Sequence, residues 1–359
     1  MRAAVLRECP GWLDIADIQI SAPGPREVLV RTVAAGLCHS DLHCIDGGLP
    51  YPVPTVLGHE SAGTVEAVGE EVTSVRPGDR VIACTSMSCG RCRACVTARP
   101  HLCTDRPVRD QRLGPVLSEN GVAISQFADI GGFAEQMLLP EQGIIKIEAD
   151  IALDRAALIG CAVTTGLGAV FNTAKVPPGA TVAVIGCGGI GLNVVQGAIV
   201  AGASRVIAID VARASLDLAR EFGATDVVDA AADDAVGRVT ELTSGGVDYS
   251  FEAIGRKETI EQAFGMLANS GTATVIGLAP FETVIELPSI SFMMERRIQG
   301  CMMGSNRFRF DIPFFIDLYL QGRIKLDELI RDRITLDEVN DGYRAMQTGA
   351  TARSVITFD

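Results

Sequence analysis

Residues 182–191 constrain the fold of this chain more than any other segment. An apolar run at 182–185 leads directly into a G-x-G-x-x-G turn, and a helical pattern follows. In such a turn Gly186 permits a tight bend, Gly188 lets the backbone approach a pyrophosphate, and Gly191 lets helix and strand pack closely, with the helix N-terminus facing the anion. The segment therefore predicts a dinucleotide-binding unit, with an ordinary tight loop as the alternative.

Strand and helix patterns alternate through the rest of this half of the chain. Strand-like runs at 205–210, 247–252 and 272–277 alternate with helical patterns at 192–201, 215–222 and 259–267. Such alternation is typical of a parallel sheet with helices on both faces. We expect about six strands by residue 303, which is the number in a doubly wound α/β fold.

The N-terminal half has a different texture. Up to about residue 81, short β segments such as 27–33 and 62–68 are separated by Pro and Gly turns, a pattern typical of a mostly β domain. Near the C-terminus, 312–321 has a helical pattern and 353–358 has the pattern of a closing strand, which we expect to return to the first domain. A chain of 359 residues is long enough for two domains, each with its own core.

A carboxylate follows the glycine turn at the distance expected for ribose recognition. The strand at 205–210 ends at Asp210, about twenty residues further on, where it can accept bonds from the adenosine ribose hydroxyls. Its charge would repel a 2'-phosphate, and neither Val211 nor Ala212 is basic. The pattern favours NAD over NADP, with Arg213 as the feature against it. A helix-capping role for Asp210 is the alternative.

Composition and charge exclude several function classes. The net charge of −13 disfavours nucleic acid and anionic membrane surfaces. The N-terminus lacks a signal-peptide pattern, and charge or glycine interrupts every apolar run before membrane-spanning length. We therefore expect a cytoplasmic protein with a small-molecule substrate. In a reducing compartment its 11 cysteines are expected as thiols.

Four cysteines lie close together in the sequence. Cys89, Cys92, Cys95 and Cys103 form a C-x2-C-x2-C-x7-C pattern in a segment rich in Gly, Arg and Pro. Four thiolates can surround one tetrahedral Zn²⁺ and leave no position for substrate, so a structural role is predicted. A redox pair at Cys89 and Cys92, or free thiols, are the alternatives.

Three further candidate ligands are dispersed along the chain. Cys38, His59 and Cys161 would supply two sulfurs and one imidazole, which leaves an open fourth position as catalytic zinc requires. Each residue alone is as readily a buried thiol or an ordinary histidine. Three of the four histidines, however, lie in the two short segments around Cys38 and His59, which favours a metal site.

These motifs occur in the order and spacing of a known family. Gly36-Leu37-Cys38-His39-Ser40-Asp41, Gly58-His59-Glu60, the four-cysteine segment, Gly160-Cys161 and the glycine turn together resemble the zinc-containing medium-chain alcohol dehydrogenases, from about residue 3 to residue 358. The resemblance implies a GroES-like, mostly β catalytic domain at 1–162 and 302–359, with a structural zinc lobe at 84–105. It also implies a Rossmann NAD-binding domain at 163–301 and two zinc ions per subunit.

The resemblance implies a role for each matching residue. Cys38, His59 and Cys161 match the catalytic zinc ligands, Asp41 the carboxylate that orients His59, and Glu60 the acid near the metal. Ser40 and His43 match the groups that carry the alcohol proton to solvent while hydride passes to NAD. The implied cofactor-binding set is His39, Thr165, Gly186, Gly188, Gly189, Ile190, Gly191, Asp210, Arg213 and Arg353. Within it, Thr165 and Ile190 match positions at the nicotinamide, and His39 and Arg353 positions near the pyrophosphate.

Substrate choice follows from the same resemblance. The positions that match the alcohol pocket are Leu49, Tyr51, Thr85, Leu278 and Met302. Thr85 is smaller than the aromatic residue of many relatives, so longer aliphatic, aromatic or terpenoid alcohols are expected. The pocket residues are also compatible with ordinary core packing.

Two other functions remain open, as does the oligomeric state. In an S-(hydroxymethyl)glutathione dehydrogenase charged anchors would stand at Gly47, Leu49 and Pro107, although Arg106 or Arg109 would be substitutes. A non-catalytic NAD- and zinc-binding relative would need neither an open zinc site nor a proton relay. The length of the stretch from Cys103 to Phe133 favours a homodimer, with a tetramer as the alternative.

Overall fold

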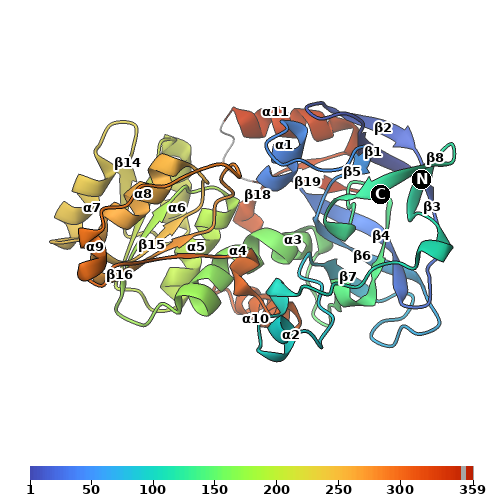
Figure 1. The fold of residues 1–359 in the computed structure, drawn as a ribbon, viewed down its shortest axis with the longest axis horizontal. Helices are drawn as coiled ribbons and strands as arrows, with labels where there is room; N and C mark the ends of the chain where they lie inside the picture. The colour runs from blue at the N-terminus through green and yellow to red at the C-terminus, as the bar shows by residue number, and fades with distance from the viewer. Residues whose placement is uncertain (349–352, 359) are drawn as a thin grey trace. The chain divides into compact units, whose positions relative to one another are not determined.

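The computed structural model describes residues 1–348 and 353–358. Contacts divide the chain into two compact units, coloured along the sequence in Figure 1. The first unit contains Met1–Cys161, Arg307–Asp317 and Leu326–Asp359, and the second contains Ala162–Asn306 and Leu318–Lys325. The resemblance assigned Ala162, 302–306 and Leu318–Lys325 to the first domain, whereas their contacts group them with the second unit.

The first unit is built mainly from strands. They are β1 (Arg2–Leu6), β2 (Leu13–Asp17), β3 (Gln19–Ile20), β4 (Glu27–Gly36), β5 (Thr55–Val56), β6 (Glu60–Val68), β7 (Arg80–Ala83), β8 (Leu117–Glu119), β9 (Val122–Gln126), β10 (Gln136–Pro140), β11 (Ile144–Lys146), β18 (Ile330–Ile334) and β19 (Arg353–Thr357). One sheet has the order β2-β1-β5-β9-β8-β3, and the other has the order β11-β7-β6-β4-β19-β18 with β10 also pairing with β4. The predicted mostly β first domain is confirmed.

Helices of the first unit are few and short. They are α1 (His39–Ile45), α2 (Arg93–Val96), α3 (Leu153–Leu158), α11 (Val339–Gln347) and α10 (Phe308–Leu320), whose last residues belong to the second unit. Short 3₁₀ turns in the first unit are η1 (Pro100–Leu102), η2 (Gln111–Leu113), η3 (Phe127–Asp129), η4 (Glu141–Gly143), η8 (Asp327–Leu329) and η9 (Leu336–Glu338).

The two ends of the chain meet in the larger sheet. Strand β19 pairs antiparallel with β4, with Val355 opposite Gly36 and Ile356 opposite Ala35. The predicted return of the closing strand is confirmed. Because β4 is covered on both sides by neighbouring strands, its C-terminal end is held in place, and it delivers the chain directly into Cys38 and α1.

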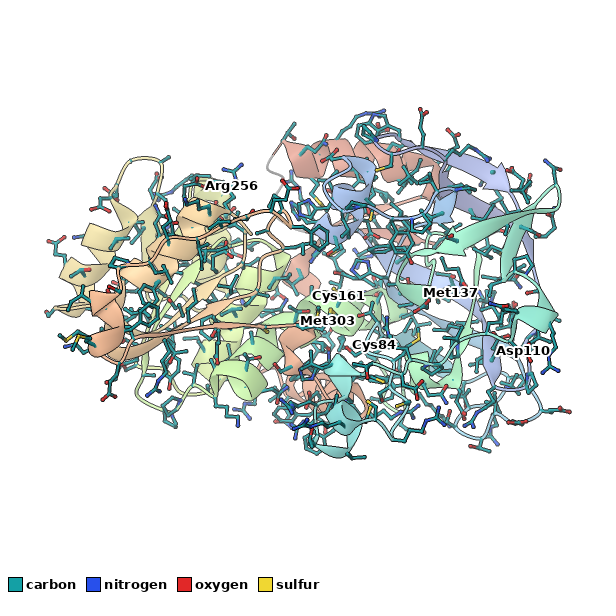
Figure 2. All side chains as sticks on the ribbon, viewed as in Figure 1. Cys84, Asp110, Met137, Cys161, Arg256 and Met303 are labelled. Carbon is teal, nitrogen blue, oxygen red and sulfur yellow. The ribbon has the colours of Figure 1, made fainter. Side chains whose placement is uncertain are left out.

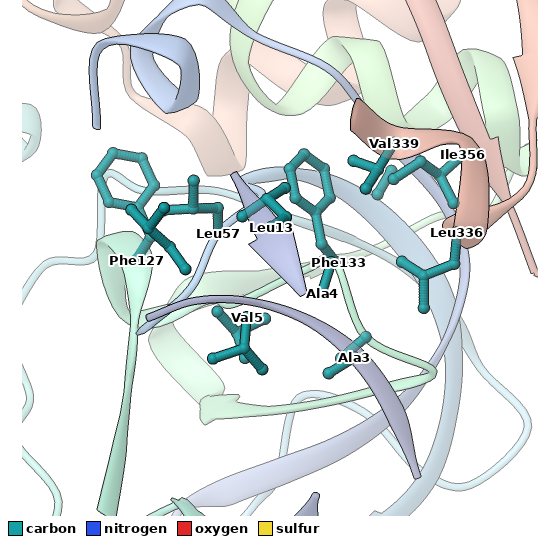
Figure 3. Close-up of a cluster of buried hydrophobic side chains, with 14 of the residues drawn as sticks. Ala3, Ala4, Val5, Leu13, Leu57, Phe127, Phe133, Leu336, Val339 and Ile356 are labelled. Carbon is teal, nitrogen blue, oxygen red and sulfur yellow. The ribbon is translucent and has the colours of Figure 1, made fainter. Parts of the chain in front are cut away.

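A continuous apolar cluster stabilises this arrangement. It brings together side chains of the N-terminal strands, the middle of the first unit and the C-terminal segment, including Leu57, Phe133, Val339 and Ile356. Figure 3 shows part of it, with Phe133 between Ala4 and the C-terminal residues. Burying each large apolar side chain contributes about 1.5–3 kcal/mol. Because the cluster contains such side chains from both ends of the sequence, both ends stabilise the core of this unit.

The second unit is a doubly wound sheet. Its strands are β12 (Thr181–Ile185), β13 (Arg205–Asp210), β14 (Asp226–Asp229), β15 (Val247–Glu252), β16 (Leu267–Val275) and β17 (Arg297–Gly300). Its helices are α4 (Thr164–Gly168), α5 (Gly189–Val200), α6 (Arg213–Glu221), α7 (Ala235–Thr243), α8 (Lys257–Gly265) and α9 (Ile290–Met293), and its 3₁₀ turn is η7 (Met303–Ser305). The strand order is β14-β13-β12-β15-β16-β17, and all neighbours are parallel.

The six predicted strands and the α/β fold class are therefore confirmed. Sequence patterns did not locate β14 or β17, since each has only four residues and neither has a long apolar run. The strand order reverses between β12 and β15, and ligands of such sheets bind beyond the carboxyl ends of the strands at this point.

One long helical stretch connects the two units in sequence. It runs over Leu153–Ala174 through α3, a π turn at Ile159–Val163, α4 and a second π turn at Ala169–Ala174. Its length and composition would suffice to cross a membrane, but 83% of its most apolar 18-residue stretch is buried inside the protein. This is the character of a core helix.

Candidate active site and metal centres

The structure brings the three dispersed ligand candidates together in the first unit. Cys38 precedes α1, His59 precedes β6, and Cys161, labelled in Figure 2, lies in the π turn after α3. All three are at most 4% exposed. Their ligand atoms and a carboxylate oxygen of Glu60 lie within 4.8 Å of one another, and the Cys161 sulfur is 3.4 Å from His59 Nε2. Single π turns inside α-helices often mark functional sites.

Asp41 holds the imidazole of His59. Its Oδ1 atom accepts the backbone N–H of Gly58 at 2.9 Å and lies 3.2 Å from His59 Nδ1. This contact directs Nε2 towards the ligand cluster. Burial lowers the pKa of His59, but the charges of Asp41 and Cys38 together raise it well above its usual value. A metal at Nε2 must therefore compete with a proton.

Glu60 lies between the ligand cluster and a buried arginine. The carboxylate is fully buried and pairs with Arg353 Nη2 at 3.3 Å. Burial raises the pKa of Glu60 to about 8, and Arg353 opposes this shift. A Cβ atom at Gly36 would lie 2.7 Å from Glu60 Oε2. The glycine that ends β4 therefore leaves the space that this carboxylate occupies.

The donor set fits zinc. The hydrogen bond from Cys161, together with the charges of Arg353 and His59, lowers the pKa of Cys38 well below its usual value although burial opposes the change. A thiolate is the form that binds metals. Two sulfurs, one imidazole and a carboxylate within reach are the ligands Zn²⁺ accepts, and few other metals share that preference.

The four closely spaced cysteines form a second cluster. Their sulfurs lie within 4.8 Å of one another, with 3.5 Å between Cys92 and Cys95. Backbone N–H groups of Arg91 and Cys92 donate to the Cys89 sulfur at 3.5 and 3.3 Å, and backbone hydrogen bonds lower the pKa of Cys92 to about 6. All eleven cysteines are free. N–H groups aimed at sulfur stabilise thiolates, so this cluster fits a closed tetrahedral zinc.

The two relay candidates share one helix face. Ser40 and His43 are three residues apart on α1, so their side chains are neighbours. Ser40 Oγ lies 3.8 Å from the Cys38 sulfur, and both relay residues are partly exposed. His39, at the first position of the helix, is exposed. The helix therefore places a hydroxyl beside the ligand cluster and an imidazole one turn further along.

An aromatic residue that sequence reasoning missed contacts two of the candidate site residues. The ring of Phe127 lies 5.4 Å from that of His59 and 5.0 Å from that of Tyr51, nearly perpendicular to both. Tyr51 donates its hydroxyl to the Gln126 carbonyl at 2.8 Å. Phe127 belongs to no motif, because its role depends on a contact across 68 residues of sequence. Of the other candidates, Leu49 packs on the same apolar cluster, and the Thr85 carbonyl accepts a hydrogen bond from Arg106.

The glycine turn of the second unit has the geometry that its pattern predicts. Gly186 has a φ of 89°, and Gly188 precedes the first turn of α5, which contains Gly189 and Ile190. A Cβ atom at Gly191 would lie 1.7 Å from the Gly186 carbonyl oxygen. Any side chain at that position would separate the helix from the strand, which explains the third glycine.

Asp210 lies beside this turn at the end of β13. Its Oδ2 accepts the backbone N–H of Cys187 at 2.7 Å, and its Oδ1 accepts that of Ala212 at 2.9 Å. The carboxylate is thereby fixed at the mouth of the glycine turn, with further lone pairs for a ligand. The Arg213 guanidinium pairs with Asp217 at 3.3 Å.

The remaining candidates of the second unit lie around α4 and after β16. Thr165 is buried, and its hydroxyl lies 3.7 Å from the Met303 sulfur. A Cβ atom at Gly166 would lie 2.7 Å from the Ile190 carbonyl oxygen, so α4 and α5 are in close contact. Leu278 and Met302, 42% and 60% exposed, also belong to this unit.

Comparisons with known proteins agree with this architecture. Residues 24–149 match the family described as alcohol dehydrogenase GroES-like domain, and residues 189–317 match the zinc-binding dehydrogenase family. An alcohol dehydrogenase zinc-binding domain protein of Burkholderia ambifaria is 33% identical, with a TM-score of 0.94 over 100% of this chain and 98% of that one. The benzyl alcohol dehydrogenase of Acinetobacter calcoaceticus is 32% identical, with a TM-score of 0.93 over 100% and 99%.

A third similar structure was solved with a coenzyme. It is a zinc-binding dehydrogenase of Sinorhizobium meliloti 1021 bound to NADP, 30% identical over 99% of both chains with a TM-score of 0.84. The motifs, the two units and these matches together show that the chain belongs to the zinc-dependent medium-chain alcohol dehydrogenase family.

Proposed function

We propose that this enzyme reversibly oxidises primary and secondary alcohols, whether aliphatic, aromatic or terpenoid, to aldehydes or ketones with transfer of hydride to NAD. The observation that carries the proposal is the buried cluster of Cys38, His59 and Cys161 with Glu60 at its side. A binding protein has no need of such a cluster next to the Ser40 hydroxyl.

Residues of the first unit would bind the metal, orient its histidine ligand and transfer the alcohol proton. Cys38, His59 and Cys161 would hold the metal, and Asp41 keeps the His59 imidazole in the orientation that offers Nε2. Zinc bound there would supply a Lewis acid that lowers the pKa of an alcohol. Ser40 then accepts the hydroxyl proton, and His43 passes it to solvent.

Cys89, Cys92, Cys95 and Cys103 would hold a second, structural zinc. Four protein sulfurs leave no open position, so this site takes no part in the reaction. The two clusters imply two zinc ions per subunit. Because thiolates at both clusters need a reducing compartment, we place the protein in the cytoplasm.

The second unit would bind the coenzyme. Gly186, Gly188 and Gly191 leave room for the pyrophosphate at the start of α5, and Asp210 accepts the ribose hydroxyls. NAD supplies the hydride acceptor. The remaining members of the proposed coenzyme set are Gly189, Ile190, Thr165, Arg213, His39 and Arg353.

Coenzyme choice has a specific test, since a similar dehydrogenase is bound to NADP. Asp210→Asn keeps the size of the side chain but removes the charge that repels a 2'-phosphate. We expect the ratio of kcat/KM for NAD to that for NADP to fall about 10²-fold, because unfavourable charge contacts cost several kcal/mol. Asp229→Asn, at the end of the neighbouring strand β14, is the control. An unchanged ratio in Asp210→Asn would assign the carboxylate to capping alone.

The small Thr85 side chain and the ion pairs of Arg106 and Arg109 support the proposed substrate class. Arg106 pairs with Asp129 at 3.6 Å, and Arg109 pairs with Glu27. Arginines already held by carboxylates are poor anchors for the charges of glutathione, which argues against an S-(hydroxymethyl)glutathione dehydrogenase. The similarity to a benzyl alcohol dehydrogenase supports uncharged, bulky alcohols.

The activity is tested by measuring NADH formation from NAD with ethanol, hexanol, benzyl alcohol, geraniol and S-(hydroxymethyl)glutathione. Zinc-loaded protein is expected to turn over the larger plain alcohols and to lose this activity with a chelator. Turnover of the glutathione adduct alone would favour the formaldehyde route. No turnover of any alcohol, nor of a ketone panel with NADH, would indicate a non-catalytic NAD- and zinc-binding relative.

We further propose a homodimer, with a tetramer as the alternative. In the second unit β17 is an edge strand, and the segment before it exposes large apolar side chains, among them Phe281 at 75% and Met293 at 76%. Edge strands and exposed large apolar side chains of this kind favour association. Sedimentation equilibrium is expected to give twice the chain mass for the native protein and a lower mass for Met293→Glu. A native monomer would contradict the proposal.

A further inference from the structure

Tyr343 has a hydroxyl that the proposed mechanism does not use. The residue lies on α11 and is the largest fully buried side chain among the described residues. Its hydroxyl has no hydrogen-bond partner within the described part of the chain. Buried tyrosine hydroxyls usually find a partner, because an unpaired buried donor is costly.

Helix α11 packs directly behind the segment that carries Cys38. A Cβ atom at Gly342 would lie 2.6 Å from Leu37 Cδ2, so the helix touches the residue before the ligand. Burial raises the pKa of Tyr343 well above its usual value, and the charges of Asp41, Cys38 and Glu60 raise it further. The hydroxyl therefore stays protonated and is available as a donor.

The Tyr343 ring also reaches the segment that carries His59. Its centroid lies 6.2 Å from that of Phe133. The backbone N–H of Phe133 donates to the Leu57 carbonyl at 2.9 Å, and a Cβ atom at Gly58 would lie 2.7 Å from the Phe133 nitrogen. Phe133 therefore connects Tyr343 to the backbone immediately before His59.

Asp41 supplies a buried acceptor next to the same backbone segment. Asp41 is fully buried, and its Oδ1 accepts the Gly58 N–H and faces His59 Nδ1. Its Oδ2 lies 3.2 Å from His59 Nδ1 but has no hydrogen-bond partner within the described residues. Tyr343, through Phe133, and Asp41, through the Gly58 N–H, thus both adjoin the backbone immediately before His59.

We propose that Tyr343 is a positioning residue for the metal site, with its hydroxyl bound through one buried water to Oδ2 of Asp41. This inference rests on the proposed zinc chemistry of the Cys38 cluster. A polar, enclosed site with two or more partners is where buried water is found. The bridge stops Asp41 from rotating, and Asp41 in turn keeps His59 Nδ1 protonated and Nε2 free for the metal.

Tyr343→Phe tests the proposal, because it removes only the hydroxyl. We expect zinc release from the Cys38 site to a colorimetric chelator to become about 10- to 100-fold faster, as for other groups that orient a metal-binding histidine. The visible bands of the Co²⁺-substituted site should shift. Release from the four-cysteine site should not change. Tyr249→Phe on β15, in the second unit, is the matched control for loss of a tyrosine hydroxyl.

A double-mutant cycle tests whether Tyr343 affects the metal site through Asp41. If Tyr343 acts through Asp41, Tyr343→Phe should have no further effect on metal release in an Asp41→Asn background. Additive effects, or a Tyr343→Phe protein with native release and cobalt bands, would overturn the inference and leave the proposed function intact. A wild-type chain that binds no metal at Cys38, His59 and Cys161 would overturn both.

Discussion

Replacement of Cys161 by serine is expected to lower kcat/KM for benzyl alcohol by at least about 10³-fold. Loss of this sulfur leaves two of the three proposed protein ligands of the open zinc site. The Lewis acid contributes several kcal/mol to transition-state stabilisation, and about 1.4 kcal/mol corresponds to a factor of ten in rate. The measurement is steady-state NADH formation, with zinc content determined on the same sample. One zinc ion per chain should be lost.

Two controls make the result specific to the metal site. Cys9 is exposed and belongs to neither cluster, so Cys9→Ser should retain both zinc ions and full turnover. Thermal unfolding of Cys161→Ser should show that the fold persists. If Cys161→Ser lost its catalytic zinc and still oxidised alcohols at the native rate, the proposed mechanism would be wrong.

The second large effect is expected on stability. Cys103→Ala should remove the structural zinc and lower Tm by roughly 5–15 °C, since loss of a structural metal costs several kcal/mol and about 1 kcal/mol shifts Tm by 2–4 °C in a domain of this size. The physical reason is local. Neither α2 nor η1 contains a buried residue, and none of residues 88–105 is buried, so the segment around the four sulfurs has no apolar core of its own to replace the metal.

The matched control lies in the same lobe. Thr97 follows α2, and its hydroxyl donates to the Arg93 carbonyl at 2.8 Å, so Thr97→Ala changes the lobe without touching a sulfur. It should lower Tm by no more than about 2–4 °C, since one neutral hydrogen bond contributes about 1 kcal/mol. A Cys103→Ala protein that lost zinc and kept the native Tm would show that the lobe folds without metal.

Interactions that are local in sequence could be read from the chain alone. The glycine turn at Gly186, Gly188 and Gly191 was predictable, because its strand, turn and helix are consecutive. The steric reason for each glycine lies within a few residues of it in the sequence. Asp210 was recognisable because it ends the next strand. The four-cysteine pattern belongs to the same class, since its sulfurs meet within one short segment.

The family resemblance predicted the dispersed zinc ligands as well. That these ligands lie close together, however, is decided by the tertiary structure. Cys38 precedes α1, His59 precedes β6 and Cys161 lies in the π turn, and only the packing of these segments brings their ligand atoms within 4.8 Å. Short strands such as β14 were not located either. Four residues carry too little periodicity, and pairing with β13 decides their conformation.

By itself, the sequence determined the order of the elements, the glycine turn and the identity of the donor atoms, because those depend on residue type and near neighbours. Only the tertiary structure decided which of these atoms share a site. The contacts of Phe127 with His59 and of Tyr343 with Phe133, and the pairing of Glu60 with Arg353, all join residues far apart in the chain. No local pattern encodes such contacts, since they arise from packing whole sheets and helices around a common core.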